Sequence, residues 1–174
     1  MVDMTAPPAL FTAAEIATRI DALAEEIAAV AQKPDIAMPI LVGGFVFAAD
    51  LVRALWKKGL GLDIEMIWLR SYGDKRVAGA ISMIAGPSEQ IAGRHVLIID
   101  GVLDAGRTIA KARALIEAAG AASVRVAVLL DKQRPDTVAQ ADHVGFVIDD
   151  QFVIGYGMDD AGRHRGLPYI GVAV

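Results

Sequence analysis

The sequence contains no cysteine, which excludes disulfides, thiolate zinc sites and thiol nucleophiles and favours a cytoplasmic location. It has no apolar run approaching the ~20 residues that a bilayer crossing needs, and residues 1–10 lack the basic and apolar regions of a signal peptide. A surplus of positive charge is also missing, since the net charge is -4. We therefore expect a soluble, cytoplasmic protein that binds neither nucleic acid nor a membrane.

Apolar residues are plentiful. They make up 55% of the chain, against 22% charged residues, so folding can bury enough surface to offset the lost conformational entropy. The 174 residues fit one domain, because a single core typically takes roughly 100–200 residues.

Hydrophobic periodicity predicts alternating strands and helices after a loose, proline-containing start. Thr12 and Glu15 fit a capping box, and apolar residues every three to four positions continue a helix to about Val30. Further strands are expected at 39–42, 62–69, 80–85, 95–99, 124–130 and 144–148, and further helices at 45–58 and from the 104–108 turn to about 119. This order predicts an α/β fold with a mostly parallel sheet, whose ligands gather at the carboxyl ends of the strands.

The segment from Asp104 to Thr108 carries the clearest chemistry. It joins a near-continuous apolar strand to a helix, so the first helical amides have no partner and are suited to bind phosphate. Gly106 allows close approach of a ligand, and the Thr108 hydroxyl could add a donor or cap the helix. The segment is neither a Walker A loop nor a GxGxxG dinucleotide loop.

Two carboxylates flank this turn. Asp100 and Asp104 follow an apolar strand beside a candidate phosphate cradle, where magnesium or ribose hydroxyls would account for them. The alternative is structural: Asp100 ends the strand and Asp104 caps the helix. These two residues alone do not separate the two interpretations.

Residues Val96 to Thr108 as a whole resemble the phosphoribosyl pyrophosphate motif of type I phosphoribosyltransferases. The resemblance runs from about Leu10 to Val172 and is best for the hypoxanthine-guanine phosphoribosyltransferases. It implies a type I phosphoribosyltransferase fold in one domain, with a core over about 10–148 and a small hood over about 149–174. It also implies purine salvage that forms a nucleoside 5'-monophosphate and pyrophosphate, dependence on Mg2+, and a homodimer or homotetramer.

The resemblance also implies roles for residues in and around the central motif. Asp104 would be the general base, and the phosphoribosyl group would be bound by Asp100, Asp104, Ala105, Gly106, Arg107 and Thr108. Val42 and Gly43 would form the pyrophosphate loop, which commonly has a non-proline cis peptide in this family, and Arg165 would assist it. Ser71 and Tyr72 would belong to a mobile loop that closes over the reaction centre.

The purine would be bound by residues further along the chain. By the resemblance, Lys132 would donate to the exocyclic oxygen of a 6-oxopurine, Phe152 would stack on the base, and Val153 would offer backbone hydrogen bonds. Asp159 would adjoin the base and hold a second magnesium through a carboxylate oxygen, and Asp100 would be the other metal ligand. Without the resemblance, Lys132 reads as a solvated strand end and Phe152 as core.

Two positions depart from the family pattern. Gly101 stands where the second of two consecutive acids is usual, and Val42 stands where a lysine is frequent. Gly101 leaves open a rival function, a nucleotide-sensing, RNA-binding regulator on the same fold, against which the acidic net charge speaks. A second rival is a phosphoribosyltransferase for xanthine, guanine or a pyrimidine.

Overall fold

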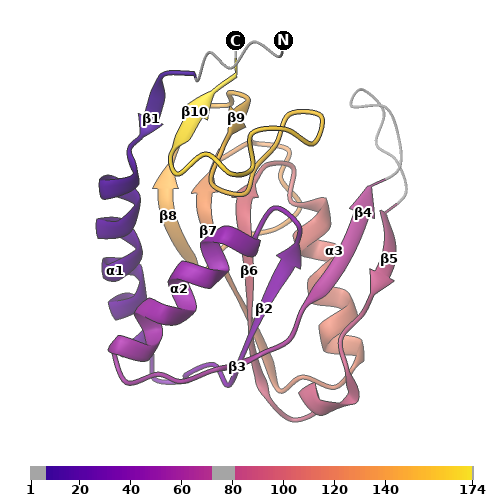
Figure 1. The fold of residues 1–174 in the computed structure, drawn as a ribbon. Coiled ribbons are helices and arrows are strands. Elements are labelled where there is room, and N and C mark those ends of the chain that lie inside the picture. The colour runs from indigo at the N-terminus through magenta and orange to yellow at the C-terminus, as the bar shows by residue number, and fades with distance from the viewer. Residues whose placement is uncertain (1–6, 72–80, 174) are drawn as a thin grey trace.

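A mostly parallel sheet forms the centre of the computed structural model, which describes residues 7–71 and 81–173 (Figure 1). Within these residues the sheet has seven strands in the order β5-β4-β2-β6-β7-β8, with β3 beside β2. Only β4 and β5 pair antiparallel among the described strands of this sheet. Its strands are β2 (Ile36–Leu41), β3 (Asp63–Ile64), β4 (Ile67–Ser71), β5 (Ile81–Ala85), β6 (His95–Leu103), β7 (Ser123–Asp131) and β8 (His143–Val147). The predicted α/β class is confirmed.

Helices cover both faces of the sheet. α1 (Ala13–Ala29) and α2 (Phe45–Lys57) lie on one face, and α3 (Arg107–Ala118) lies on the other (Figure 1). The predicted capping box at the start of α1 is present, because Thr12 and Glu15 exchange hydrogen bonds between side chain and backbone. A 3₁₀ turn, η1 (Glu89–Ile91), precedes β6.

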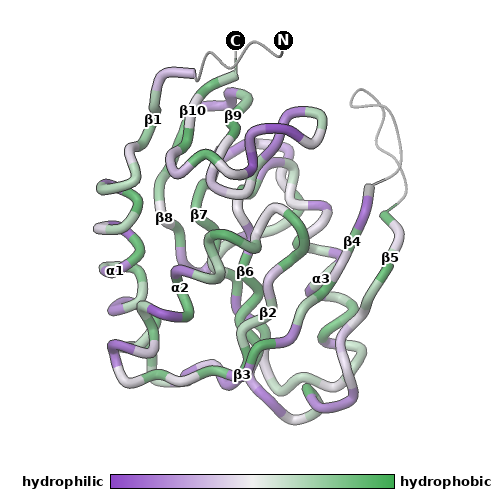
Figure 2. Tube along the Cα trace, viewed as in Figure 1, coloured by the Kyte–Doolittle hydropathy of each residue, from purple (hydrophilic) through white to green (hydrophobic). Residues whose placement is uncertain are grey.

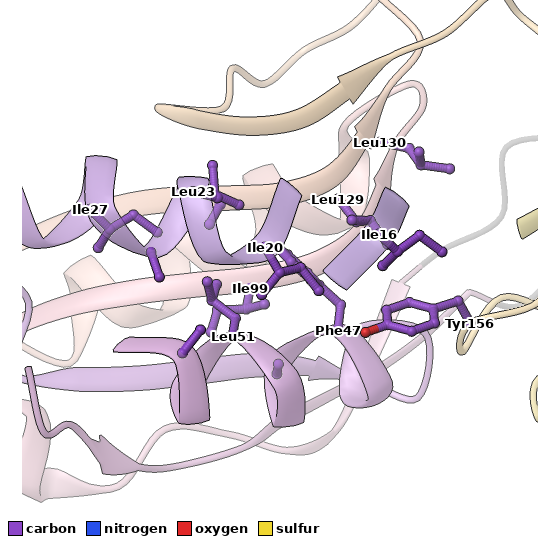
Figure 3. Close-up of a cluster of buried hydrophobic side chains, with 14 of the residues drawn as sticks. Ile16, Ile20, Leu23, Ile27, Phe47, Leu51, Ile99, Leu129, Leu130 and Tyr156 are labelled. Atoms are coloured by element: carbon purple, nitrogen blue, oxygen red, sulfur yellow. The ribbon is translucent and has the colours of Figure 1, made fainter. Parts of the chain in front are cut away.

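The β6 strand shows why the central strands of this sheet are continuous apolar runs. Leu97 and Ile99 pack with the α1 and α2 side, whereas Val96 and Ile98 pack with the α3 side. Figure 3 shows Ile99 and Leu129 among side chains of α1 and α2, and Figure 2 shows the apolar character of the central strands. Both faces of the sheet are therefore buried, and the polar residues lie at the ends of its strands.

Three boundaries differ from the sequence-based prediction. β6 continues to Leu103 rather than ending at residue 99, since Val102 and Leu103 still pair with β7. The single strand predicted at 62–69 is two strands, β3 and β4. The predicted loose start contains β1 (Ala9–Phe11).

A second, small sheet lies over the carboxyl ends of the central strands (Figure 1). Its three strands among the described residues have the order β1-β10-β9, where β9 is Val153–Ile154 and β10 is Ile170–Val172. The tail after residue 149 therefore consists of short strands and loops, as predicted. None of the helices in the described part of the chain has the length and apolar character of a membrane span.

His143, at the start of β8, makes the stability of the fold sensitive to acid. It is 8% exposed, and within the described residues its Nε2 atom has no hydrogen-bond partner. Burial lowers the pKa of His143, with Arg125 acting in the same direction and Asp142 and Glu26 opposing it. Because the fold favours the neutral ring, the unfolded chain binds more protons below about pH 6.5, and stability is lost as the pH falls further.

We therefore expect His143→Gln to flatten the fall in Tm between about pH 7 and about pH 5 by roughly 2–4 °C. Thermal unfolding followed by circular dichroism at several pH values measures this. Equal pH slopes for the variant and the parent protein would contradict the assignment.

Candidate active site

The turn between β6 and α3, the predicted phosphate cradle, has no side-chain cap. Gly106 has φ 75° and is the N-cap residue of α3, with no side chain capping the helix. The first amides of the helix are therefore left without intrahelical partners at the positive end of its dipole. The predictions that Asp104 or Thr108 caps the helix are wrong, because the backbone of Gly106 occupies that position.

Strand register brings Asp104 and Lys132 together. Leu103 of β6 pairs with Asp131 of β7, and the Lys132 amide donates to the Leu103 carbonyl at 3.1 Å. The next residues then extend from neighbouring strand ends, and Lys132 Nζ lies 3.1 Å from Asp104 Oδ2. The predicted general base and the predicted purine-binding lysine thus form an ion pair beside the predicted phosphate cradle.

Two residues that the sequence analysis did not single out complete this cluster. Arg134 Nη1 lies 3.3 Å from Asp104 Oδ1 and 2.8 Å from Asp150 Oδ2, and Lys132 Nζ lies 3.3 Å from Asp150 Oδ1. Asp136 binds the outer side of Arg134 at 2.9 Å. The signal that could have found Asp150 is its position just after β8, since β8 pairs with β7.

Asp100 lies in β6, four residues before Asp104, and is partly buried. Burial raises the pKa of Asp100 to about 7, although the Gly101 amide, which donates to Asp100 Oδ1 at 2.7 Å, acts in the opposite direction. A carboxylate kept from solvent gains from a cationic ligand, because the cation offsets the cost of its burial.

The predicted pyrophosphate loop follows β2, and the Leu41–Val42 peptide is cis. The Gly43 carbonyl oxygen is enclosed by two other glycines: a Cβ built on Gly101 would lie 3.0 Å from it, and one on Gly157 would lie 2.6 Å from it. The departure from the family pattern at Gly101 therefore coincides with close packing of the loop on β6.

Apart from Lys132, the predicted purine-binding residues lie in β9 of the small sheet, directly before it, or in the loop after it. Val153 is buried in β9, and Phe152 is 46% exposed, so the interpretation of Phe152 as core is wrong. Asp159 and Arg165 are brought together at 2.8 Å, and Arg165 Nη1 also donates to the Gly157 carbonyl at 2.6 Å. The predicted metal ligand and the predicted pyrophosphate arginine are thus partners in this structure.

The small sheet and its loop are tied to α2 by Tyr156. The Tyr156 hydroxyl donates to Asp50, which also pairs with Arg53. Burial, followed by the contact with Asp50, raises the pKa of Tyr156 and keeps the hydroxyl protonated as a donor. Figure 3 shows the Tyr156 ring at the edge of the buried cluster next to Phe47.

The predicted mobile loop and the predicted magnesium ligands stay predictions. Ser71 ends β4, while Tyr72 lies outside the described residues. The described part of the chain contains no group of three or more His, Asp or Glu side chains placed to hold a metal ion.

The mostly parallel sheet flanked by helices is consistent with the type I phosphoribosyltransferase fold. The phosphoribosyl transferase domain model matches residues 9–161. The chain belongs to the phosphoribosyltransferase family, on the branch of the hypoxanthine and hypoxanthine-guanine enzymes.

Three similar proteins illustrate this membership. The hypoxanthine phosphoribosyltransferase of Haemophilus influenzae is 39% identical over 78% of this chain and 75% of its own length. A solved structure from a study of how the C-terminal region affects the oligomeric state and activity of Trypanosoma cruzi hypoxanthine phosphoribosyl transferase is 34% identical, covers 96% of this chain and 91% of its own, and has a TM-score of 0.87. The bifunctional protein TilS/HprT of Listeria innocua is 39% identical over 76% of this chain, which spans only 20% of that longer protein.

Proposed function

We propose that the protein transfers the 5-phosphoribosyl group of phosphoribosyl pyrophosphate to hypoxanthine, forming the nucleoside 5'-monophosphate and pyrophosphate. The observation that carries the proposal is the Asp104–Lys132 pair at 3.1 Å, at adjoining strand ends beside the start of α3. A 6-oxopurine presents an exocyclic acceptor near a ring N–H, which matches a cationic donor next to a carboxylate.

The residues divide the chemistry among themselves. The backbone amides of Gly106, Arg107 and Thr108, at the start of α3, hold the 5'-phosphate, and Ala105 lies in the same turn. Lys132 donates to the exocyclic oxygen, Asp104 accepts the imidazole-ring proton as the nitrogen attacks C1′, and Phe152 stacks on the base. Val153 offers its backbone to the base. The pyrophosphate leaves past Val42, Gly43 and Arg165, while Ser71 and Tyr72 belong to a loop that excludes water.

Magnesium fits the donor set. Asp100 and Asp159 offer carboxylate oxygens, and Mg2+ is commonly held by one or two carboxylates together with substrate phosphates and water. The raised pKa of Asp100, about 7, fits a buried carboxylate whose charged form a bound cation would stabilise. When bound, magnesium neutralises charge on the leaving pyrophosphate.

The proposal extends to organisation and location. The chain forms one phosphoribosyltransferase domain, with a core over about 10–148 and a hood over about 149–174. The protein is cytoplasmic and assembles as a homodimer or homotetramer, and the T. cruzi relative, whose C-terminal region was studied for its oligomeric state, supports testing assembly alongside activity.

One assay tests the function. Purified protein is incubated with phosphoribosyl pyrophosphate, magnesium and, in turn, hypoxanthine, guanine, xanthine, adenine or uracil, and nucleotide formation is followed by chromatography. We expect the highest kcat/KM with hypoxanthine and loss of activity with a chelator. Retention of RNA without pyrophosphate release from any base would instead favour the RNA-binding regulator, which the names of the reported relatives do not favour.

A further inference from the structure

The cluster around Asp104 is a closed ring of four alternating charges. Going around it, Asp104 contacts Lys132, Lys132 contacts Asp150, Asp150 contacts Arg134 and Arg134 contacts Asp104. The four N–O distances are 3.1, 3.3, 2.8 and 3.3 Å in that order. We call these four residues the charge ring.

Burial within the charge ring is uneven. The Lys132 side chain is 8% exposed, whereas the Asp150 side chain is 53% exposed. A nearly buried ammonium needs charged partners, because removing one leaves its desolvation cost uncompensated. Lys132 Nζ has three N–H donors, and in the described residues two of them serve Asp104 and Asp150. The third N–H remains for a ligand, and the contacts with Asp104 and Asp150 set the direction in which the ammonium group points.

Arg134 has the matching relation to Asp104. Its Nη1 lies 3.3 Å from Asp104 Oδ1, the oxygen that is buried and that accepts no hydrogen bond from any described residue. Lys132 occupies the other oxygen, Oδ2, at 3.1 Å. Arg134 is itself held by Asp136 and Asp150, so its positive charge stays next to Asp104 Oδ1.

From this geometry we propose that Asp150 and Arg134 are positioning residues with separate tasks, Asp150 acting through Lys132 and Arg134 acting through Asp104. The inference rests on the proposed function and deepens it. Asp150 keeps Lys132 aimed at the exocyclic oxygen of the purine and supplies its counter-charge when the base comes between Lys132 and Asp104. Arg134 keeps the Asp104 carboxylate oriented for the proton that it accepts.

The two tasks predict different kinetic effects. Asp150→Asn loosens the group that recognises the base, so the KM for hypoxanthine should rise about three- to tenfold, while the KM for phosphoribosyl pyrophosphate stays within about twofold. Arg134→Met loosens the proton acceptor, so kcat should fall about tenfold with little change in the KM for hypoxanthine. Arg134→Lys retains a cation and should recover most of that kcat.

Steady-state kinetics with both substrates, together with Tm for each variant, test the proposal. The matched control is Glu26→Gln, which removes one carboxylate from the Arg19–Glu26 ion pair on α1, and we expect wild-type kinetics from it. An unchanged KM for hypoxanthine in Asp150→Asn would overturn the assignment of tasks, and so would equal losses for both substrates in both ring variants. In either case, turnover by the wild-type protein would still uphold the enzyme function. Absence of nucleotide formation by the wild-type protein with every base would overturn both.

Discussion

Asp104→Asn should lower kcat with hypoxanthine by roughly 10²–10⁴-fold, the range in which a positioned general base contributes. The amide has nearly the shape of the carboxylate but cannot take up the ring proton, and it leaves Lys132 and Arg134 with one carboxylate fewer. Nucleotide binding should persist, because in the proposed function the amides at the start of α3 bind the phosphate, independently of this side chain. Turnover assays and calorimetric titration with inosine 5'-monophosphate measure the two effects.

The control for this variant is Asp63→Asn. Asp63 is also an aspartate in an ion pair, at 2.9 Å from Arg94, but it lies in β3, next to the first residues of β2, away from the carboxyl ends of the strands. We expect kcat near the wild-type value from it. Turnover of Asp104→Asn within tenfold of wild type would show that another group accepts the proton.

The central strands were predictable because their burial is two-sided. The run from Val96 to Ile99 alternates between two apolar surfaces, so every position in it had to be apolar. Where β6 ends was not predictable. Gly101 reads locally as a turn residue, yet pairing with β7 carries the strand on to Leu103, and that register is decided between segments about 28 residues apart.

β1 was missed for a related reason. Its three residues, Ala9–Phe11, are too few to show a hydrophobic periodicity, and their partner β10 lies near the other end of the chain. The stacking of Phe11 on Phe146, with ring centroids 4.0 Å apart, adds a further contact that only the folded chain brings about. Short strands of this kind exist through tertiary pairing rather than local propensity.

The candidate site was predictable to the extent that it is local in sequence. Asp100 and Asp104 stand in one motif with the phosphate cradle, and Lys132 follows a strand end. The charge ring was not predictable, because Asp150 reaches Lys132 only through the pairing of β8 with β7. An isolated Asp or Arg in a polar segment carries no sign of which strand end it faces.

The second large effect should come from Gly157→Ala. Gly157 has φ 98°, and a Cβ there would lie 2.6 Å from the Gly43 carbonyl oxygen and 3.4 Å from Val46 Cβ. The methyl group must push the segment around Gly157 away from the pyrophosphate loop, and Arg165 moves with it because it binds the Gly157 carbonyl. We expect the KM for phosphoribosyl pyrophosphate to rise by roughly tenfold or more, since misplacing a binding group by about 1 Å can cost about 10²-fold in rate.

Gly59→Ala is the control that separates the effect of the contact with the Gly43 carbonyl from the effect of backbone strain. Gly59 has a similar φ of 81°, but a Cβ there meets no atom within 4 Å. Both variants should therefore share the cost of placing alanine in the left-handed region, about 1–2 kcal/mol, whereas only Gly157→Ala should lose more stability and affinity for phosphoribosyl pyrophosphate. Chemical denaturation and steady-state kinetics on the pair decide the matter. Equal losses of stability together with unchanged KM values would mean that the Gly43 carbonyl can move without cost, and that the close packing of the three glycines does not hold the loop in place.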